Sequence, residues 1–513
     1  MTEFPGHPAW RRSGLAAGIA LALTACAVGP DFKPPEAPQV TAADHPYTPA
    51  ALPAQTASAP GAGGAAQRFA AGDDIPAQWW QLYRSEPLDL LIRSALAQSP
   101  TLASAQAALR QAQESYNADA GNKRFPAVTG QLGATRERVS QASSGVPGGS
   151  VFSLYSASVD VSYTIDAWGA TRRELEGLLA AVDYQRYQVE AAYLSLTANV
   201  VTTAIQEASL RAQLQATRDV LDAEAQSLSV VEKQASLGAV ARSVVIAQRT
   251  QLAQTRATLP SLEKSLAQTR HQLAVYAGRL PSDAGLPEFG LESLQLPQDL
   301  PVSVPSALVR QRPDIRASEA LLHEASAQVG VATANLYPQI TLSGSAGAQS
   351  LKLDKLFSSG SATWSLGASL LQPIFNGGAL QAQKRGAVAA FDEARAQYQQ
   401  TVLNAFLNVA NTLRALDLDA DALRAQAETE SLARESLDLV VHQYKLGAVS
   451  YLSLLDSQRT YQQARVGLVQ AQAARYADTA ALFQALGGGW WNRAELADIS
   501  ATASGAASAP ARP

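Results

Sequence analysis

Residues 151–166 of this chain read VFSLYSASVDVSYTID, and apolar and polar side chains alternate along the stretch. From Tyr155 to Ile165 one set is apolar or aromatic, whereas the intervening set consists of serine, threonine and aspartate. A repeat of two residues indicates a β-strand, because successive side chains of a strand point to opposite faces of its sheet. The stretch therefore predicts a strand that meets water on one face only.

Three other stretches alternate in a similar way, and segments rich in glycine and serine join the four into two pairs. A pair of alternating runs with such a connection is typical of a β-hairpin. We therefore expect four strands per chain, at residues 126–138, 151–166, 338–349 and 361–374.

Each strand pair is followed by a long segment without helix breakers other than isolated glycines, residues 172–236 and 381–445. At 1.5 Å per residue, each segment would form a helix roughly 100 Å long, far above the mean for globular proteins. Each ends at a Leu-Gly-Ala-Val turn, where glycine permits the left-handed cap from which a chain reverses. A returning helix follows, with leucine at every seventh position from Leu252 to Leu273, a repeat typical of supercoiled helices.

The paired layout reflects an internal duplication. The turn ASLGAV at 235–240 corresponds to YKLGAV at 444–449, an offset of 209 residues, and Pro100 corresponds to Pro313, an offset of 213 residues. A nearly constant offset over this span indicates a repeated structural unit. We expect a first repeat at 72–290, an equatorial linker at 291–312 and a second repeat at 313–488, with helices at 170–236, 241–278, 379–445 and 450–486.

The N-terminus resembles the leader of a bacterial lipoprotein. Arg11 and Arg12 precede an apolar run, interrupted only by Thr24, that has the length of a signal-peptide core and is too short to span a membrane. The run ends in Leu-Thr-Ala-Cys26, which resembles a lipobox and contains the only cysteine of the chain. That resemblance implies a signal peptide at 1–25 and, on Cys26, an N-acyl group and an S-diacylglycerol. Ala27 in place of aspartate favours sorting to the outer membrane.

Two segments are dominated by small residues and proline. We expect residues 26–71 to form a lipid anchor with a tether or an arm laid over the body, and residues 489–513 to form an equatorial end with a disordered tail.

Composition and motifs argue against several classes of protein. The net charge of −4 and the absence of a Lys/Arg-rich block argue against a nucleic-acid partner. The five histidines lie in no metal-ligand spacing, and neither a phosphate-binding loop nor a nucleophile elbow is present. We therefore expect no enzyme activity, no metal site and no cofactor other than the covalent lipid.

Several motifs resemble those of TolC-type outer-membrane factors and occur in the same order as in that family. The resemblance is closest to the lipoprotein branch that serves RND efflux pumps (the NodT-like group). The resemblance covers about residues 26–488, and its motifs are the lipobox with VGPDF at 28–32, Trp79-Trp80, IDAWG at 165–169, QPIFNGG at 372–378 and the two Leu-Gly turns. It implies a mainly helical chain with membrane β-strands. Three copies, each with four strands and two long plus several shorter helices, would form a twelve-stranded β-barrel continuous with a twelve-helix α-barrel, the periplasmic tunnel.

The resemblance implies a lipid-anchored channel in the outer membrane of a Gram-negative bacterium, with a long periplasmic extension. Such a channel passively conducts drugs or other small toxic compounds. Its partners are copies of itself, a periplasmic adaptor (membrane fusion protein), an inner-membrane RND pump and outer-membrane lipid. Three alternatives stay open: an exit duct for type I protein secretion, a soluble four-stranded sheet packed on helices, and a coiled-coil lipoprotein that links membrane and wall.

The resemblance also assigns roles to individual residues. Leu452 and Asp456, with Arg459 as a counterion, correspond to a periplasmic gate of apolar and carboxylate rings, whereas Val244 and Ala247 stand where the first repeat often carries an aspartate. The tips that dock the adaptor comprise Leu237, Gly238, Val240, Leu446, Gly447, Val449 and Ser450. Tyr155, Tyr163 and Trp364 are candidates for the aromatic belt at the membrane interface. Each feature also has a plainer explanation: a simple turn, a solvated aspartate or an aromatic that packs.

Overall fold

The computed structural model describes residues 28–36, 47–145, 147, 149–283 and 285–493. These residues form two compact units, each built from separate stretches of the chain. Residues up to 35, 108–186 and 317–399 form the first, here called the sheet unit, and residues 36–107, 187–316 and 400 onward form the second, the hairpin unit. Two helices of 67 residues, α5 (Ala170–Ser236) and α9 (Ala379–Lys445), contribute to both.

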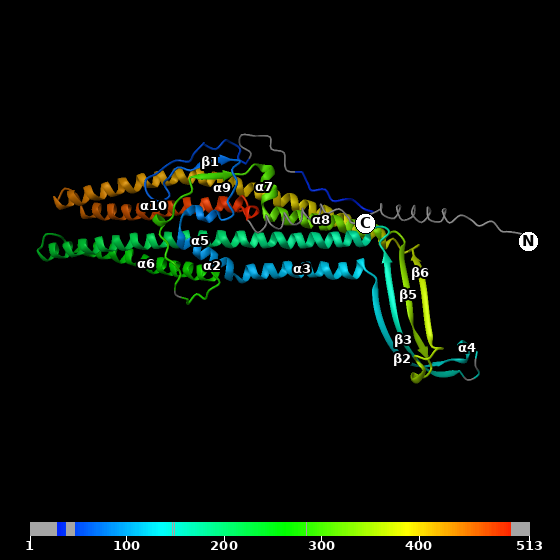
Figure 1. Cartoon of the computed structure of the whole chain (residues 1–513). Coiled ribbons are helices and arrows are strands. Elements are labelled where there is room, and N and C mark those ends of the chain that lie inside the picture. Colours follow the sequence, from blue (N-terminus) through cyan, green and yellow to red (C-terminus); the bar gives the residue numbers. More distant parts are fainter. Residues whose placement is uncertain (1–27, 37–46, 146, 148, 284, 494–513) are drawn as a thin grey trace, which may run out of the picture. The chain divides into compact units, whose positions relative to one another are not determined.

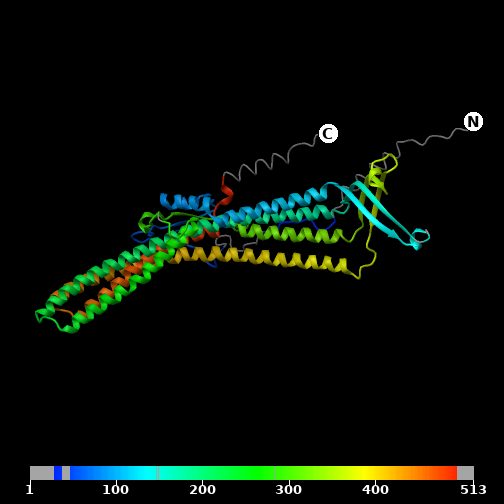
Figure 2. The same ribbon diagram turned by 90° about the horizontal axis from the view of Figure 1, so that it is seen from below.

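A four-stranded antiparallel sheet organises the sheet unit (Figures 1 and 2). The order of the strands is β2-β3-β5-β6, so the second strand of the first repeat pairs with the first strand of the second repeat. The strands are β2 (Ala127–Val139), β3 (Ser150–Ile165), β5 (Gln339–Ser350) and β6 (Ala362–Leu371). The helices next to them are α3 (Pro100–Arg124), α4 (Gln141–Ser144), α8 (Pro313–Ala334) and η3 (Leu353–Lys355).

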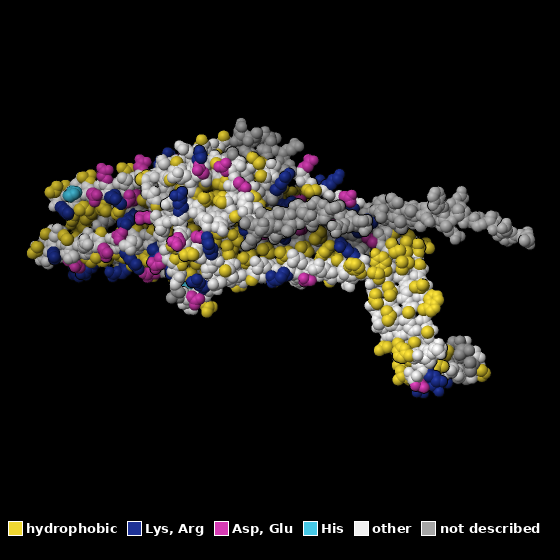
Figure 3. Space-filling model, in the orientation of Figure 1, with side chains coloured by type: hydrophobic (Ala, Val, Ile, Leu, Met, Phe, Trp, Pro, Cys, Tyr) yellow, Lys and Arg dark blue, Asp and Glu magenta, His cyan; other side chains and the backbone are white. Residues whose placement is uncertain are grey.

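The register gives this sheet one apolar and one polar face, because directly opposed residues of antiparallel strands share a face. One row of opposed residues is apolar and the next row, on the other face, is polar: Val128, Val161, Gly344 and Leu366, then Thr129, Asp160, Ser345 and Ser365. The exposed large side chains of the apolar face include Leu132, Val159, Leu342, Trp364, Leu366 and Leu370. In Figure 3 the visible side of these strands is hydrophobic or uncharged, and charged side chains gather at the end near α4. The described residues therefore do not form a sheet with one face packed on helices, as one of the alternatives required.

Two antiparallel helical hairpins lie side by side in the hairpin unit (Figures 1 and 2). The later part of α5 returns as α6 (Arg242–Tyr276), and the later part of α9 returns as α10 (Tyr451–Ala485). Near the two turns a small apolar cluster joins the hairpins: Val231, Val245, Tyr451 and Leu454. Within the described ranges, no helix combines the length and the hydropathy needed to cross a membrane.

The main core of the hairpin unit forms around three aromatic residues of η1 (Trp79–Tyr83). Trp79, Trp80 and Tyr83 are all buried. Trp79 stacks on Phe483 of α10 with ring centroids 5.3 Å apart, and Trp80 Nε1 donates a hydrogen bond to Asp89 Oδ1 at 2.9 Å. The other short elements of this unit are α2 (Glu86–Gln98), η2 (Leu291–Ser293), α7 (Pro305–Gln311) and η4 (Trp490–Asn492).

The four expected strands are all present, and the described residues contain two further short strands that were not expected. β1 (Arg68–Ala71) and β4 (Asp299–Val302) pair in parallel, which joins part of the expected tether to the expected linker. Polar contacts hold the segment: buried Gln67 donates to the carbonyl of Pro297 at 2.8 Å and to Thr479 Oγ1 at 3.0 Å. Arg475 of α10, also buried, donates to Thr56 Oγ1 at 3.0 Å. Residues 47–71 are therefore an arm bound to the hairpin unit, held by partners that composition does not reveal.

Candidate functional site

The two hairpin turns have the same backbone structure. In the first turn Gly238 has φ 74°, and in the second Gly447 has φ 75°. The amides of Gly238 and Ala239 donate to the carbonyls of Ala235 and Gln234, at 3.0 and 2.8 Å. The same pair of bonds recurs around Gly447. This is the Schellman arrangement, which satisfies carbonyls left over at a helix end and places glycine in the left-handed region.

The side chains at the tips divide into exposed and half-buried sets. Leu237 and Leu446 are both 84% exposed, so each turn presents one leucine to its surroundings. Val240 and Val449, also expected at the docking tips, are half-buried, and Val240 packs against the apolar cluster that joins the hairpins. Ser450 is the N-cap of α10, where its Oγ accepts a hydrogen bond from the amide of Ser453.

The three residues of the expected gate lie on the first turns of α10. Leu452 is 73% exposed, and Asp456 lies one helical turn further along the same face. Arg459 Nη2 donates to Asp456 Oδ1 at 2.7 Å, so the counterion expected from the sequence contacts the carboxylate within one chain. Val244 of α6, at the position where the first repeat often carries an aspartate, packs on the apolar cluster between the hairpins.

Polar links between the hairpins were missed by sequence reasoning. Tyr451 of α10 donates its hydroxyl hydrogen to Gln248 of α6, and burial raises the pKa of Tyr451, which keeps the hydroxyl neutral. Farther from the tips, Arg465 of α10 pairs with Asp219 of α5 at 2.6 Å. The partners lie 203 and 246 residues apart in sequence, and only the repeat of Gln248 at Gln458 could have drawn attention to them.

The three candidate aromatics of the belt lie on one face of the sheet. Tyr155 and Tyr163 occupy odd positions of β3, and Trp364 of β6 lies in the row of Val159 and Ala346 on the same face. Trp364 is exposed and the two tyrosines are half-exposed. The arrangement suits side chains that meet lipid or its headgroups.

Cys26, the candidate for lipidation, lies outside the described residues. The first described residue is Val28, whose amide donates to the carbonyl of Trp168 at 3.0 Å, shortly after β3. Asp31 pairs with Arg173 at 2.5 Å, and Phe32 stacks on His323 at 4.3 Å between ring centroids. Among the described residues no group of histidine, cysteine and carboxylate side chains is arranged to hold a metal ion.

Two long helical hairpins in tandem and a sheet that exposes an apolar face define a class of protein, the channel subunits of the bacterial outer membrane. The profile of the outer membrane efflux protein family matches residues 91–279 and 304–488. The two segments begin 213 residues apart and end 209 residues apart, the offset of the internal duplication. The chain belongs to the outer membrane efflux protein family.

Individual relatives agree with this assignment. The pyoverdine export outer membrane protein OpmQ of Pseudomonas aeruginosa is 34% identical over 424 residues, which cover 80% of this chain and 87% of OpmQ. The probable efflux pump outer membrane protein TtgC of Pseudomonas putida is 28% identical and covers 94% of this chain and 98% of its own. Among solved structures, the outer-membrane channel OprN superposes with a TM-score of 0.81 at 28% identity, covering 91% of this chain and all of its own. The chain is thus an efflux channel component of the outer membrane.

Proposed function

We propose that three copies of this chain form the outer-membrane duct of a tripartite efflux system. In this system an inner-membrane RND pump and a periplasmic adaptor deliver small toxic compounds to the duct. The sheet with one apolar face and two outer strands, β2 and β6, carries the proposal. Because unpaired backbone groups are costly in lipid and four strands are too few to close a barrel, β6 of one copy pairs with β2 of the next. Twelve strands then enclose a lumen lined by the serine and threonine face.

Trimer formation is tested on the full chain, extracted from outer membranes in mild detergent. An unheated sample should migrate on a denaturing gel as a trimer and, after boiling, as a monomer, because a closed barrel resists detergent until heated. The same material should form discrete conductance steps in planar bilayers. A monomer that forms no channel would contradict the proposal.

The names of the relatives favour small molecules as cargo. OpmQ is a pyoverdine exporter and TtgC a probable efflux pump component, and both cover at least 80% of this chain. Loss of this chain should therefore raise the sensitivity of its host to small toxic compounds and leave protein secretion unchanged. The opposite pattern would favour the type I secretion duct.

The exposed leucines of the two turns are the docking points for the adaptor in this proposal. Leu237 and Leu446 are equivalent in the duplication and equally exposed, so a trimer presents six similar tips. Exposed leucines on a rigid, glycine-capped turn suit a hydrophobic contact with a partner's helical hairpin. Replacing both leucines with aspartate should abolish cross-linking to the adaptor and leave the trimer intact.

Leu452 and Asp456 form the periplasmic gate in this proposal. Three Asp456 carboxylates around an axis repel one another when ionised, and Arg459 at 2.7 Å lowers that repulsion. Alanine at both Leu452 and Asp456 should raise single-channel conductance, whereas alanine at Glu435, an exposed acid of α9, should not. Equal conductance of the double variant and the wild type would remove the gate from these residues.

A further inference from the structure

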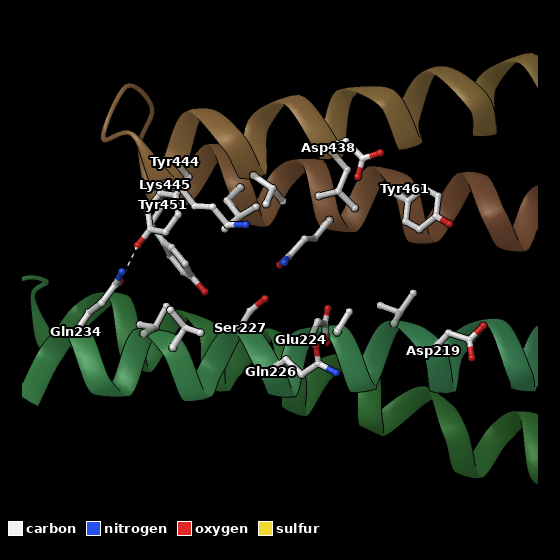
Figure 4. A pocket seen from close by; sticks show the side chains of 18 of the residues that line it. Asp219, Glu224, Gln226, Ser227, Gln234, Asp438, Tyr444, Lys445, Tyr451 and Tyr461 are labelled. Atoms are coloured by element: carbon white, nitrogen blue, oxygen red, sulfur yellow. Dashed lines mark hydrogen bonds between the residues drawn. The ribbon is translucent and has the colours of Figure 1, made fainter.

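A cavity of about 520 Å³ lies between the two hairpins of the hairpin unit, near their turns (Figure 4). Its walls come from α5 on one side and from α9 and α10 on the other. The size is that of pockets that hold drug-sized molecules. Its apolar and aromatic lining includes Val231, Leu437, Val441, Tyr444, Tyr451 and Tyr461.

A buried carboxyl group lies in this lining. Glu224 of α5 is only 1% exposed, and its Oε1 accepts hydrogen bonds from Gln251 and Thr255 of α6, both at 3.1 Å. Its Oε2 is buried and has no partner among the described residues. Burial raises the pKa of Glu224, as expected for a carboxylate without a compensating positive charge. A buried acceptor without a donor is costly. A ligand that donates a hydrogen bond to Oε2 would remove this cost.

A second unpartnered acceptor lies in the same lining. Gln458 of α10 is 9% exposed, and its Oε1 has no donor in the described part of the chain. Its counterpart in the first repeat, Gln248, has partners on both side-chain atoms: its amide nitrogen donates to the carbonyl of Glu224, and its oxygen accepts from Tyr451. The two equivalent glutamines therefore differ: the side-chain oxygen of Gln248 has a donor, whereas that of Gln458, which lines the cavity, has none in the described part of the chain.

We propose that this cavity binds an organic cation, an ammonium or guanidinium group on an aromatic or aliphatic body. The two free acceptors fit a charged donor group, and three tyrosine rings suit a cation with an apolar body. Two basic residues line the cavity and neither pairs with Glu224: Arg465 pairs with Asp219 at 2.6 Å, and Lys445 of α9 makes no ion pair with Glu224 in the described part of the chain. Three acidic and two basic side chains line the cavity, so an anion would face a lining that is acidic on balance. Among the described residues the acidic side chains form no group arranged to hold a metal ion.

The site lies within one chain and does not require the proposed trimer or gate. The ligand contacts α5 through Glu224 and α10 through Gln458, and therefore links the two hairpins near their turns. Occupancy should consequently make separation of the hairpins more difficult.

Titration calorimetry on the full chain in a non-ionic detergent tests the proposal with two matched probes, 2-phenylethylamine and 2-phenylethanol. The probes differ little in size, but at neutral pH only the amine is cationic. We expect saturable binding of the amine, at least about tenfold tighter than that of the alcohol, as a charge-assisted hydrogen bond provides. Glu224→Gln should weaken the amine at least about tenfold and leave the alcohol unchanged.

Two further variants keep the outcome interpretable. Asp222→Asn removes the same charge from an exposed position of α5 outside the cavity and should leave both affinities unchanged. Gln458→Leu should weaken the amine severalfold, and it provides the result if Glu224→Gln does not fold. Equal affinities for amine and alcohol, equal effects of the substitutions at Glu224 and Asp222, displacement of the amine by magnesium chloride at unchanged ionic strength, or no binding would each overturn the proposal.

Discussion

The substitution Leu366→Arg tests which face of the sheet meets lipid. Leu366 lies in the middle of the ten-residue strand β6, 82% exposed, in the apolar row with Val161 and Gly344. If this face meets lipid, an arginine there costs about 2–4 kcal/mol per chain near the middle of the bilayer. That cost corresponds to a roughly 30- to 700-fold change in the equilibrium constant for insertion of each chain, and it applies to all three copies of the proposed trimer.

The neighbouring Ser365 gives the matched control. It points to the other face, in the row of Asp160 and Ser345, so an arginine there enters the proposed lumen and can pair with Asp160. Ser365→Arg should therefore insert like the wild type and change ion selectivity, whereas Leu366→Arg should reduce the amount of heat-modifiable trimer in the outer membrane. Refolding into lipid vesicles, followed over a urea gradient, measures the difference in free energy.

Three results would refute the division into faces. They are normal insertion of Leu366→Arg, a loss of insertion for Ser365→Arg alone, and equal losses for both. Each would mean that the rows of the single-chain sheet do not correspond to lipid and lumen.

The remaining predictions concern stability, the turns and the anchor. Burial and then the hydrogen bond and repulsion from Asp419 raise the pKa of Asp478 to about 8, so the folded chain keeps a proton that the unfolded chain loses above its ordinary value of 3.8. The free energy of unfolding should therefore fall as the pH rises from about 4 to about 8. Asp478→Asn should raise it by roughly 1–2 kcal/mol at about pH 8, but little at about pH 5. Gly447→Ala should lower the free energy of unfolding by about 1 kcal/mol, because residue 447 has a positive φ, although the added methyl group would meet no other atom. Gly447→Asn should lower it by less, because asparagine adopts this conformation more readily. Cys26→Ser should abolish labelling by radioactive palmitate, and labelling that persists would contradict lipidation at this residue.

The elements with strong local patterns could be predicted from the sequence. The long helices lack breakers and end at Leu-Gly turns, and the structure places them at Ala170–Ser236 and Ala379–Lys445. The strand that alternates most clearly was expected at 151–166 and spans Ser150–Ile165. In these segments the hydrophobic repeat and the residues that end each element suffice to predict the structure, because each residue's environment depends on its neighbours in sequence.

Features that depend on distant partners could not be predicted. The pairing of β1 with β4 joins two four-residue segments more than two hundred residues apart, neither with a strand pattern. The half-burial of Val240 and the link from Tyr451 to Gln248 arise only when two hairpins pack together. Glu224 likewise reads as one acid among many on a long helix, and only the structure shows that it is enclosed.

The arm at residues 47–71 has a consequence for the order of folding. Gln67 reaches its partner Thr479 across 412 positions of the chain, and Thr56 meets Arg475 across 419. The arm precedes these partners by more than four hundred residues, so its bonds to α10 form only when nearly the whole chain is present. Contacts of such sequence separation close late and slowly. The arm thus joins the beginning of the hairpin unit to its last helix, and a chain truncated before α10 would keep the pairing of β1 with β4 but lose the bonds to Thr479 and Arg475.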